Sequence, residues 1–539
     1  MAAIGCVCSV ISFATLRAFP GAEGFGKYTS GGRGGQVVYV TSLEDDANGE
    51  IEGTLRWAMK QYPDEPLTVC FAVTGEIRLV KDLRLNRRSN FTWAGQTAPG
   101  TGIVITHNKV NFGGSENFII RNIRFRVGNE DANGNFLNAN AVGAENCANF
   151  IFDHCDFGWS SEENMNSFDS HFFTIQYCIV HEGLYNGGNP KGKRGYGCQW
   201  GGSPATYHHN LLTNNLKRSC RFNGARNNDN VVYIDYINNV VYNYGGGSNG
   251  CYGGECNSNI SEYNGKNAAH EVNFINNYYK PTSNTQSERN FFQSDYARDG
   301  ATSWTPSQWY VSGNVMEGSE AITNDNWKGV KVLTYTKDQI RVDTLIRPRL
   351  NYYNWVSEDS VQGRYNFKRL AYAAGVFETA PEAYETVLDT VGAFPRDSVE
   401  LRLIHEVRTG TLTYTGSKEG KPGWIDSPSD AEGFFAYEPA DPLTDTDQDG
   451  MPDEWELANG CDPLVADNNA LHETGYTMLE AYLHYAMTGT EIWADEDDDD
   501  DAVEVVYPSE KVQKILRDGQ IYIQRGAKIY TITGLVISD

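Results

Sequence analysis

The sequence has 539 residues, 70 of them acidic and 44 basic, and its formal net charge is −26 at pH 7. A chain this negative is repelled by phosphate groups, which argues against general binding to nucleic acid or to an anionic membrane surface. Hydrophobic residues make up 40% and aromatic residues 12%, which predicts a folded protein with one large domain and appendages. No apolar run in the sequence reaches the ~18 residues that a membrane span requires.

The first 18 residues are mostly small and apolar, and they end just before Phe19 and Pro20. They resemble the later part of a secretory signal peptide without its basic beginning. We therefore predict a signal segment over residues 1–18 and a protein that is secreted, periplasmic or held at the cell surface.

Short β-rich segments recur through the middle of the chain, from "NFIIRNIRF" to "WYVSGNVM", spaced by 32, 23, 32, 29, 38 and 37 residues. The aligned positions are Ile123, Cys155, Cys178, Asn210, Asn239, Asn277 and Asn314. Repeats of this length cannot bury their apolar faces alone and must stack as coils. We therefore predict an all-β fold, a right-handed parallel β-helix. A β-sandwich is the rival fold, but the repeats lack the hairpin turn signals that it needs.

Two residue types indicate what lies inside the coils. Asn recurs at the aligned position of the later segments, which predicts an inward ladder of amides at one bend. Five cysteines fall within apolar segments and are predicted to be reduced core residues. They are Cys147, Cys155, Cys178, Cys198 and Cys220.

The stretch from Gly183 to Asn228 reverses the charge of the chain, with seven basic residues and no acidic one. The basic residues are Lys191, Lys193, Arg194, Lys217, Arg218, Arg221 and Arg226. Such a concentration of positive charge indicates a fixed anionic ligand, and the acidic pair Glu162 and Glu163 just upstream suits a hard cation. Together they predict an acidic polymer handled with the help of a metal ion. A solvated basic loop and a metal-free acidic cluster remain the simpler alternatives.

After about Gly318 the pattern changes. Residues 380–410 have helical periodicity, with Asp397 or Ser398 as an N-cap and Gly392 as a stop, and we expect these helices to wrap one side or end of the β-helix. The predicted boundaries are a β-helix domain over 19–440, a small acidic calcium-binding module over 441–490, an acidic linker over 491–507 and a small β segment over 508–539.

The acidic module contains "DTDQDGMPDEWE", which fits the calcium-loop pattern D-x-D-x-D-G-x5-E. The predicted ligands are the side chains of Asp445, Asp447, Asp449, Asp453 and Glu456 and the carbonyl group of Met451. Gly450 allows the sharp turn. The segment resembles thrombospondin type 3 or dockerin-like loops, and we expect its calcium ion to be structural.

Further motifs carry a resemblance to a known family. Between residues 19 and 410 the chain contains, in order, "AFPGAEGFGKYTSGGRGG", "GTLRWA", "FAVTGEIRL", "WAGQTAPGTGI", "FDHCDFGWSSEEN", "NPKGKRGYGCQWGG" and "YHHNLLTNNLKRSCRF". These motifs resemble the pectate lyases of polysaccharide lyase family 1, in the Bacteroidetes style. The resemblance implies calcium-assisted β-elimination of α-1,4-polygalacturonate, the acidic polysaccharide of de-esterified pectin.

The resemblance assigns Arg218 as the group that removes the C5 proton, because it matches the first arginine of the family's R-x-P-x-x-R motif. Two positions depart from that motif: Cys220 stands in place of the proline and Asn223 in place of the second arginine. A guanidinium group normally stays protonated, so this role requires calcium and neighbouring positive charge, or Arg218 acts largely through its own charge. Arg221 or Arg226 is the candidate for the second arginine.

The resemblance also implies substrate and metal ligands. Lys191 matches the lysine of the family's "PKG" element, which binds a substrate carboxylate, and its neighbours Lys193 and Arg194 reinforce it. Glu162 and Glu163 match the family's calcium-binding acidic pair. A third ligand is changed, because Asn140 stands where the family has Asp. The aromatic residues Trp159, Trp200 and Tyr196 are candidates for the sugar cleft or for the core.

Two other functions stay open at this point. An inverting polygalacturonase-type hydrolase needs carboxylates on either side of the scissile bond, and its "NTD", "GHG" and "RIK" patterns are missing from the sequence. A non-catalytic β-helix that only binds pectin is the second alternative, favoured by the departures at Asn140, Cys220 and Asn223. We predict a monomeric, secreted pectate lyase.

Overall fold

The computed structural model describes residues 16–538 except 86, 132, 225–230, 246–249, 255–268, 286–288, 295–305, 334, 347–377, 419–420, 435, 493–511, 518–519, 526–527 and 532–535. The chain forms two compact units, Met1–Trp493 and Ala494–Asp539. The first unit contains three parallel sheets and the second a small antiparallel sheet.

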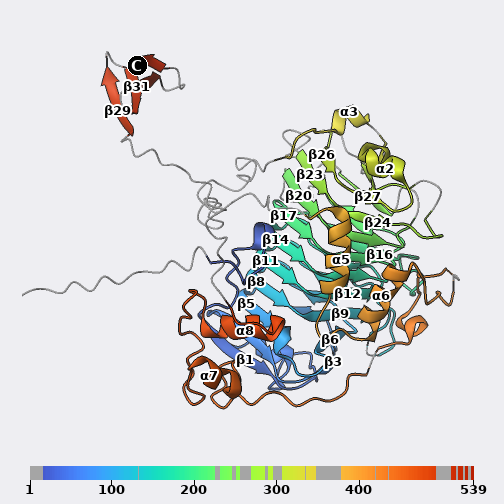
Figure 1. The fold of residues 1–539 in the computed structure, drawn as a ribbon. Coiled ribbons are helices and arrows are strands. Elements are labelled where there is room, and N and C mark those ends of the chain that lie inside the picture. Colours follow the sequence, from blue (N-terminus) through green and yellow to red (C-terminus); the bar gives the residue numbers. More distant parts are fainter. Residues whose placement is uncertain are drawn as a thin grey trace, which may run out of the picture. The chain divides into compact units, whose positions relative to one another are not determined.

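The three parallel sheets, here called A, B and C, run along the first unit (Figure 1). Sheet A contains β1 (Gln36–Val40), β2 (Leu67–Phe71), β5 (Ser89–Ala94), β8 (Glu116–Arg121), β11 (Ala148–Asp153), β14 (His171–Gln176), β17 (Ala205–His208), β20 (Val231–Ile237), β23 (Ala269–Ile275) and β26 (Gln308–Ser312). Sheet B contains β3 (Gly75–Arg78), β6 (Ile103–Thr106), β9 (Ile123–Gly128), β12 (Asp156–Ser160), β15 (Ile179–His181), β18 (Leu211–Thr213), β21 (Val240–Tyr242), β24 (Tyr278–Lys280) and β27 (Val315–Met316). Sheet C contains β4 (Leu83–Arg84), β7 (Val110–Asn111), β10 (Val142–Gly143), β13 (Glu163–Asn166), β16 (Tyr196–Trp200), β19 (Cys220–Phe222), β22 (Cys251–Gly253), β25 (Phe292–Ser294) and β28 (Val330–Val332). The predicted right-handed parallel β-helix is confirmed.

The register of sheet A confirms the coil spacing predicted from the sequence. One ladder of paired residues runs through Phe118, Phe150, Phe173, Ala205, Ile234, Val272 and Trp309. Consecutive members are separated by the six predicted intervals. The rings of Phe118, Phe150 and Phe173 stack with centroids 4.8 and 4.4 Å apart, so identical side chains in successive coils build the core.

The corner between sheets A and B shows why Asn recurs there. The Oδ1 atoms of Asn239, Asn277 and Asn314 each accept a hydrogen bond from the backbone N–H of the equivalent Asn one coil earlier, at 2.8 to 3.0 Å. All are fully buried. The residue just before each of these positions has a positive φ, as at Asn238 (55°) and Asn276 (50°), which turns the chain. The predicted Asn ladder is therefore confirmed.

Two helices cover sheet B (Figure 1). They are α5 (Ala380–Thr390) and α6 (Ser398–Thr409), and their apolar faces pack against strand residues such as Ile179, Leu211 and Val240. Asp397 caps α6 as predicted, because its carboxylate accepts the backbone N–H groups of Val399 and Glu400. The helical wrap is present, and it leaves the outward face of sheet C to form a cleft.

The remaining short helices lie in the loops between strands and near the ends of the first unit. They are η1 (Gly24–Gly26), α1 (Leu55–Ala58), η2 (Gly95–Thr97), α2 (Glu320–Asn324), η4 (Asn326–Gly329), α3 (Lys337–Ile340) and η7 (Pro428–Ala431).

The acidic module packs on the first strands of sheet A. Its helices are α7 (Asp453–Asn459) and α8 (Met478–Thr488), and Met451, Trp455 and Leu479 share an apolar cluster with Cys70 and Ala94 of the β-helix. The module therefore belongs to the same compact unit as the coils.

The second unit holds β29 (Val512–Arg517), β30 (Gln520–Arg525), β31 (Lys528–Thr531) and β32 (Val536–Ser538), paired antiparallel. These strands form a small meander within the β segment predicted over residues 508–539. No helix of the described residues is both long and apolar enough to cross a membrane.

The five core cysteines predicted to be reduced are all buried and unpaired, which confirms that prediction.

Candidate active site

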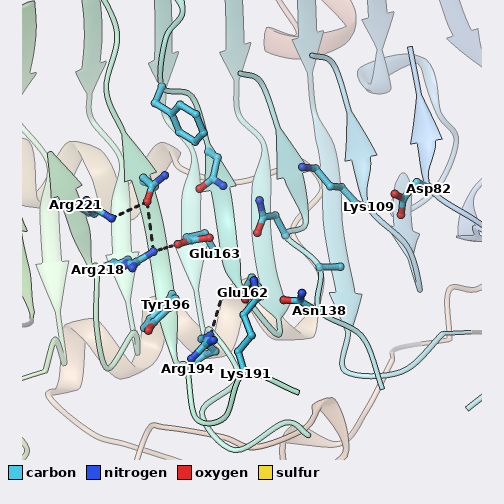
Figure 2. A pocket seen from close by; sticks show the side chains of 15 residues that line it. Asp82, Lys109, Asn138, Glu162, Glu163, Lys191, Arg194, Tyr196, Arg218 and Arg221 are labelled. Carbon is cyan, nitrogen blue, oxygen red and sulfur yellow. Dashed lines mark hydrogen bonds and ion pairs between the residues drawn. The ribbon is translucent and has the colours of Figure 1, made fainter. Parts of the chain in front are cut away.

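A cleft of about 560 Å³ lies on the outward face of sheet C (Figure 2). Its walls come from the strands β13, β16 and β19, from the loops beside them, and from the segments that precede β4, β7 and β10. The lining residues are Asp82, Lys109, Asn138, Ala139, Asn140, Glu162, Glu163, Asn166, Phe168, Lys191, Arg194, Tyr196, Gln199, Arg218 and Arg221. Parallel pairing places Glu163 beside Tyr196, and Gln199 beside both Asn166 and Arg221, so stacked coils assemble the site from distant segments.

Two buried glutamates form the centre of the cleft. Glu162 pairs with Lys191, whose Nζ lies 2.8 Å from Oε1, and with Arg194, whose Nε lies 3.2 Å from Oε2. Glu163, the next residue, forms an ion pair with Arg218. Two adjacent acids at the beginning of β13 would repel each other, and these cations offset that repulsion.

Several contacts constrain Arg218, which lies two residues before β19. Its φ of 53° is unusual for a residue with a side chain. The Nε atom donates to the Tyr252 hydroxyl at 3.0 Å, and the guanidinium carbon lies 4.1 Å from the centroid of the Tyr196 ring. Arg221 donates to Gln199 Oε1 at 3.0 Å. Burial raises the pKa of the Tyr196 hydroxyl, which keeps it protonated.

The structure brings most of the predicted site residues together. Lys191, Arg194, Arg218 and Arg221 line the cleft with Glu162, Glu163 and Asn140. Lys193 is not among the lining residues; its Nζ lies 5.5 Å from the ring centroid of Tyr185. Arg226 lies outside the described residues.

Of the three aromatic candidates, only Tyr196 lines the cleft. Trp159 is buried under α6 and Trp200 lies in the core of the coils, so both are packing residues.

Sequence reasoning missed several cleft residues. Lys109 and Asp82 come from β-helix coils that precede the basic stretch, and Gln199 and Asn166 are neutral. Asn166, Gln199 and Arg221 occupy paired positions on adjacent strands of sheet C. This pairing follows from the coil repeat, but the strands of sheet C are too short for the repeat to be recognised there in the sequence.

The oxygen atoms in the cleft fit a hard cation such as Ca²⁺. Besides the two glutamates, the amide oxygens of Asn140 and Asn166 are within the lining, and Asn166 Oδ1 is buried without a hydrogen-bond partner among the described residues. Both glutamates are paired with Lys or Arg in the structure.

The predicted calcium loop lies away from the cleft, against sheet A. The carboxylates of Asp445, Asp447 and Asp449 converge there, and Glu456 joins Asp449. Burial and the neighbouring carboxylates raise the pKa of Glu456 to about 8 and that of Asp449 to about 6.

Two further predicted ligands of the loop are the Met451 carbonyl group and the Asp453 carboxylate, and their roles stay predictions. The Met451 side chain is buried in the apolar cluster of the module. The Asp453 carboxylate accepts the N–H and hydroxyl groups of Thr446, each at 2.7 Å.

No family model matches the chain. It is 30% identical over 486 residues to a probable pectate lyase C of Aspergillus terreus, which covers 87% of this chain and 94% of that protein. It is also 30% identical over 480 residues to a probable pectate lyase C of Emericella nidulans, with coverage of 87% and 93%. Among solved structures, Jun a 1, the major allergen from cedar pollen, is similar with 13% identity and a TM-score of 0.44, over 69% of this chain and 93% of that one.

Proposed function

The chain belongs to the pectate lyase family and is a polysaccharide lyase, and we propose that it cleaves α-1,4-polygalacturonate by calcium-assisted β-elimination. Arg218 is the group that removes the C5 proton in this proposal. The observation that carries it is the cleft on sheet C, where Arg218 lies among further cations and beside two buried glutamates.

The charge of the cleft supports an acidic polysaccharide as substrate. Five lining residues are cationic and three are acidic, in a chain whose net charge is −26. The cations are Lys109, Lys191, Arg194, Arg218 and Arg221. Polygalacturonate carries one carboxylate on each sugar, so a bound chain can pair with several of these side chains at once.

During the elimination, electrons move from the bond between C5 and its proton toward the glycosidic oxygen on C4. The Arg218 guanidine takes the C5 proton, the electrons of that bond form a double bond between C4 and C5, and the bond from C4 to the glycosidic oxygen breaks. The departing oxygen takes its proton from water. Lys191 and Arg194 hold the substrate carboxylates in place. A calcium ion held by Glu162 and Glu163, with the amide oxygens of Asn140 and Asn166, would stabilise the negative charge that develops on the C6 carboxylate.

Arg218 has to leave Glu163 before it can act. In the structure the two side chains form an ion pair. A cation held by Glu163 would compete with Arg218 for that carboxylate and would release the Arg218 side chain toward the substrate. The ion pair thus supports a requirement for calcium in proton abstraction.

From the sequence we also propose that the enzyme is exported and that it is of the Bacteroidetes type. The segment Asp445–Glu456 is, in this proposal, a calcium loop of the thrombospondin type 3 kind. Residues 1–15 of the predicted signal segment lie outside the described residues.

The test is product analysis of polygalacturonate digests. Calcium-dependent formation of unsaturated uronide, detected by its ultraviolet absorbance and abolished by chelator, supports the proposal. New reducing ends without that absorbance would indicate a hydrolase. Binding of polygalacturonate without any cleavage would favour the pectin-binding alternative.

A further inference from the structure

Acidic side chains of the C-terminal module converge on one point. Oxygen atoms of Asp445, Asp447 and Asp449 lie within 4.8 Å of one another, and so do those of Asp449, Glu456 and Asp467. Asp449 belongs to both groups, so the five carboxylates form one cluster. Asp467 lies beyond the loop motif, in the segment that leads into α8.

The cluster has no positive counter-charge among the described residues. Glu456 is fully buried, and neither of its carboxylate oxygens has a hydrogen-bond partner in the part of the chain that the structure describes. Asp447 Oδ2 and Asp467 Oδ1 are buried and unpartnered in the same way. A buried carboxylate without a partner is costly, because it has lost its water and gained nothing in return. Five converging carboxylates without a counter-charge therefore indicate a site for a cation.

The donor set selects the class of cation. All five side chains offer carboxylate oxygens, and a hard ion that takes six to eight oxygen ligands is Ca²⁺. Mg²⁺ usually keeps several waters and is held by one or two carboxylates, which fits a cluster of five carboxylates poorly. Gly450, with a φ of 103°, makes the turn that folds the loop around the point of convergence.

The cluster is fastened to the β-helix on several sides. The Tyr39 hydroxyl of β1 donates to Asp445. A Cβ atom on Gly450 would lie 3.3 Å from Val37 and 3.6 Å from Cys70, so the loop backbone rests directly on β1 and β2.

The helix that follows Asp467 is fastened separately. In α8, Glu480 pairs with Arg33 at 2.6 Å. The five ligands therefore come from three segments, the loop, α7 and the approach to α8, and each is in contact with the first coils or with an element that is.

We propose that one Ca²⁺ bound by Asp445, Asp447, Asp449, Glu456 and Asp467 clamps the C-terminal module onto the first coils of the β-helix. This ion holds the three segments of the module in one arrangement against sheet A. The proposal is independent of the function proposed for the cleft and needs no activity measurement.

The experiment uses the full chain after removal of metal, titrated with CaCl₂ by calorimetry and followed by amide hydrogen exchange. The wild type should bind Ca²⁺ and show slower exchange over α7, α8 and β1 when it is bound. Asp467→Asn should weaken binding by about tenfold or more, because it removes one charged ligand. Asp462→Asn is the matched control: it removes one charge from the same segment, and Asp462 lies outside the cluster.

Three results would overturn the proposal. The first is a wild type with no heat of binding beyond that of the variant Glu456→Gln. The second is Asp467→Asn binding Ca²⁺ as the wild type does. The third is binding without any slowing of exchange in α7, α8 or β1, which would leave an ion but no clamp. Glu163→Gln, which alters only the cleft, should keep the slowed exchange.

Discussion

Charged side chains line two faces of the same β-helix. Their role depends on whether a helix covers that face. On sheet B, α6 covers Arg124 and Arg126, which are at most 2% exposed and pair with Asp156, Asp397 and Glu400. On sheet C, the cleft leaves Lys191 and Arg218 open to solvent, with 59% and 18% of their side chains exposed. The same residue types therefore serve stability on one face and are available to a ligand on the other.

The balance of charge differs in the same way. Under α6 each buried cation has a carboxylate partner, and His181 lies between Asp156 and Glu182 at 3.1 and 3.3 Å. In the cleft, cations outnumber acids five to three. Where every buried cation has a carboxylate partner, removing one member leaves a buried charge unpaired and destabilises the fold. A surplus of positive charge attracts an anion.

The largest effect on stability is expected from Arg126→Ala on the covered face. It leaves Asp156 and Asp397 buried without their shared cation, and should lower the free energy of unfolding by about 3–5 kcal/mol. Arg408→Ala is the control, because Arg408 pairs with the exposed Glu385 and Asp389 and should cost under about 1 kcal/mol. Denaturant unfolding measures both. Equal losses of unfolding free energy in the two variants would mean that burial under α6 does not make an ion pair more important for stability.

The covered face should also set the response to acid. Burial alone would raise the pKa of Asp156, but Arg126 and His181 outweigh it and lower that pKa to about 2. A carboxyl with a lowered pKa stabilises the fold above its unfolded pKa near 4, and this contribution, roughly 2 kcal/mol, is lost as the pH falls toward 2. The slope of unfolding free energy against pH should be shallower in Asp156→Asn. The matched control is Asp389→Asn, which removes an exposed carboxylate.

On the open face, Glu163→Gln should raise the calcium concentration needed for half-maximal activity by about tenfold, because one charged ligand is lost. Glu145→Gln is its control: Glu145 lies near Lys109 but is not among the cleft-lining residues. The measurement is the initial rate against free Ca²⁺. An unchanged calcium dependence in Glu163→Gln would remove this residue from the metal site.

The smallest effects on activity are expected from the lysines at the edge of the cleft. Lys191→Ala should raise KM for polygalacturonate about fivefold, while Lys193→Ala, two positions away, should change it less than about twofold. Steady-state kinetics at low ionic strength measure both. If the two variants behave alike, the basic stretch acts as a diffuse charge and not as a shaped site.

The coil architecture could be predicted from the sequence because it repeats. The spacing of the strands and the Asn ladder follow from a recurring pattern of apolar residues and amides, and the structure reproduces each interval. Asp397 was found in the same way, since a helix start has a local signature.

What could not be predicted depends on contacts between distant segments. Arg124 and Arg126 look like surface residues in the sequence, but α6 arrives more than 270 residues later to bury them. Tyr252 and Gln199 reach Arg218 from other coils, and no local pattern points to them. Asp467 lies outside the calcium-loop motif for the same reason.

Arg218 is the residue on which the proposed elimination depends most directly. The decisive measurement is the rate at which Arg218→Ala forms unsaturated uronide from polygalacturonate at saturating Ca²⁺, beside the wild type and with thermal unfolding as a check of the fold. We predict a rate lower by about 10³-fold with an unfolding midpoint close to that of the wild type. A folded Arg218→Ala protein that keeps its rate within tenfold of the wild type would contradict the assignment of Arg218 as the group that removes the C5 proton.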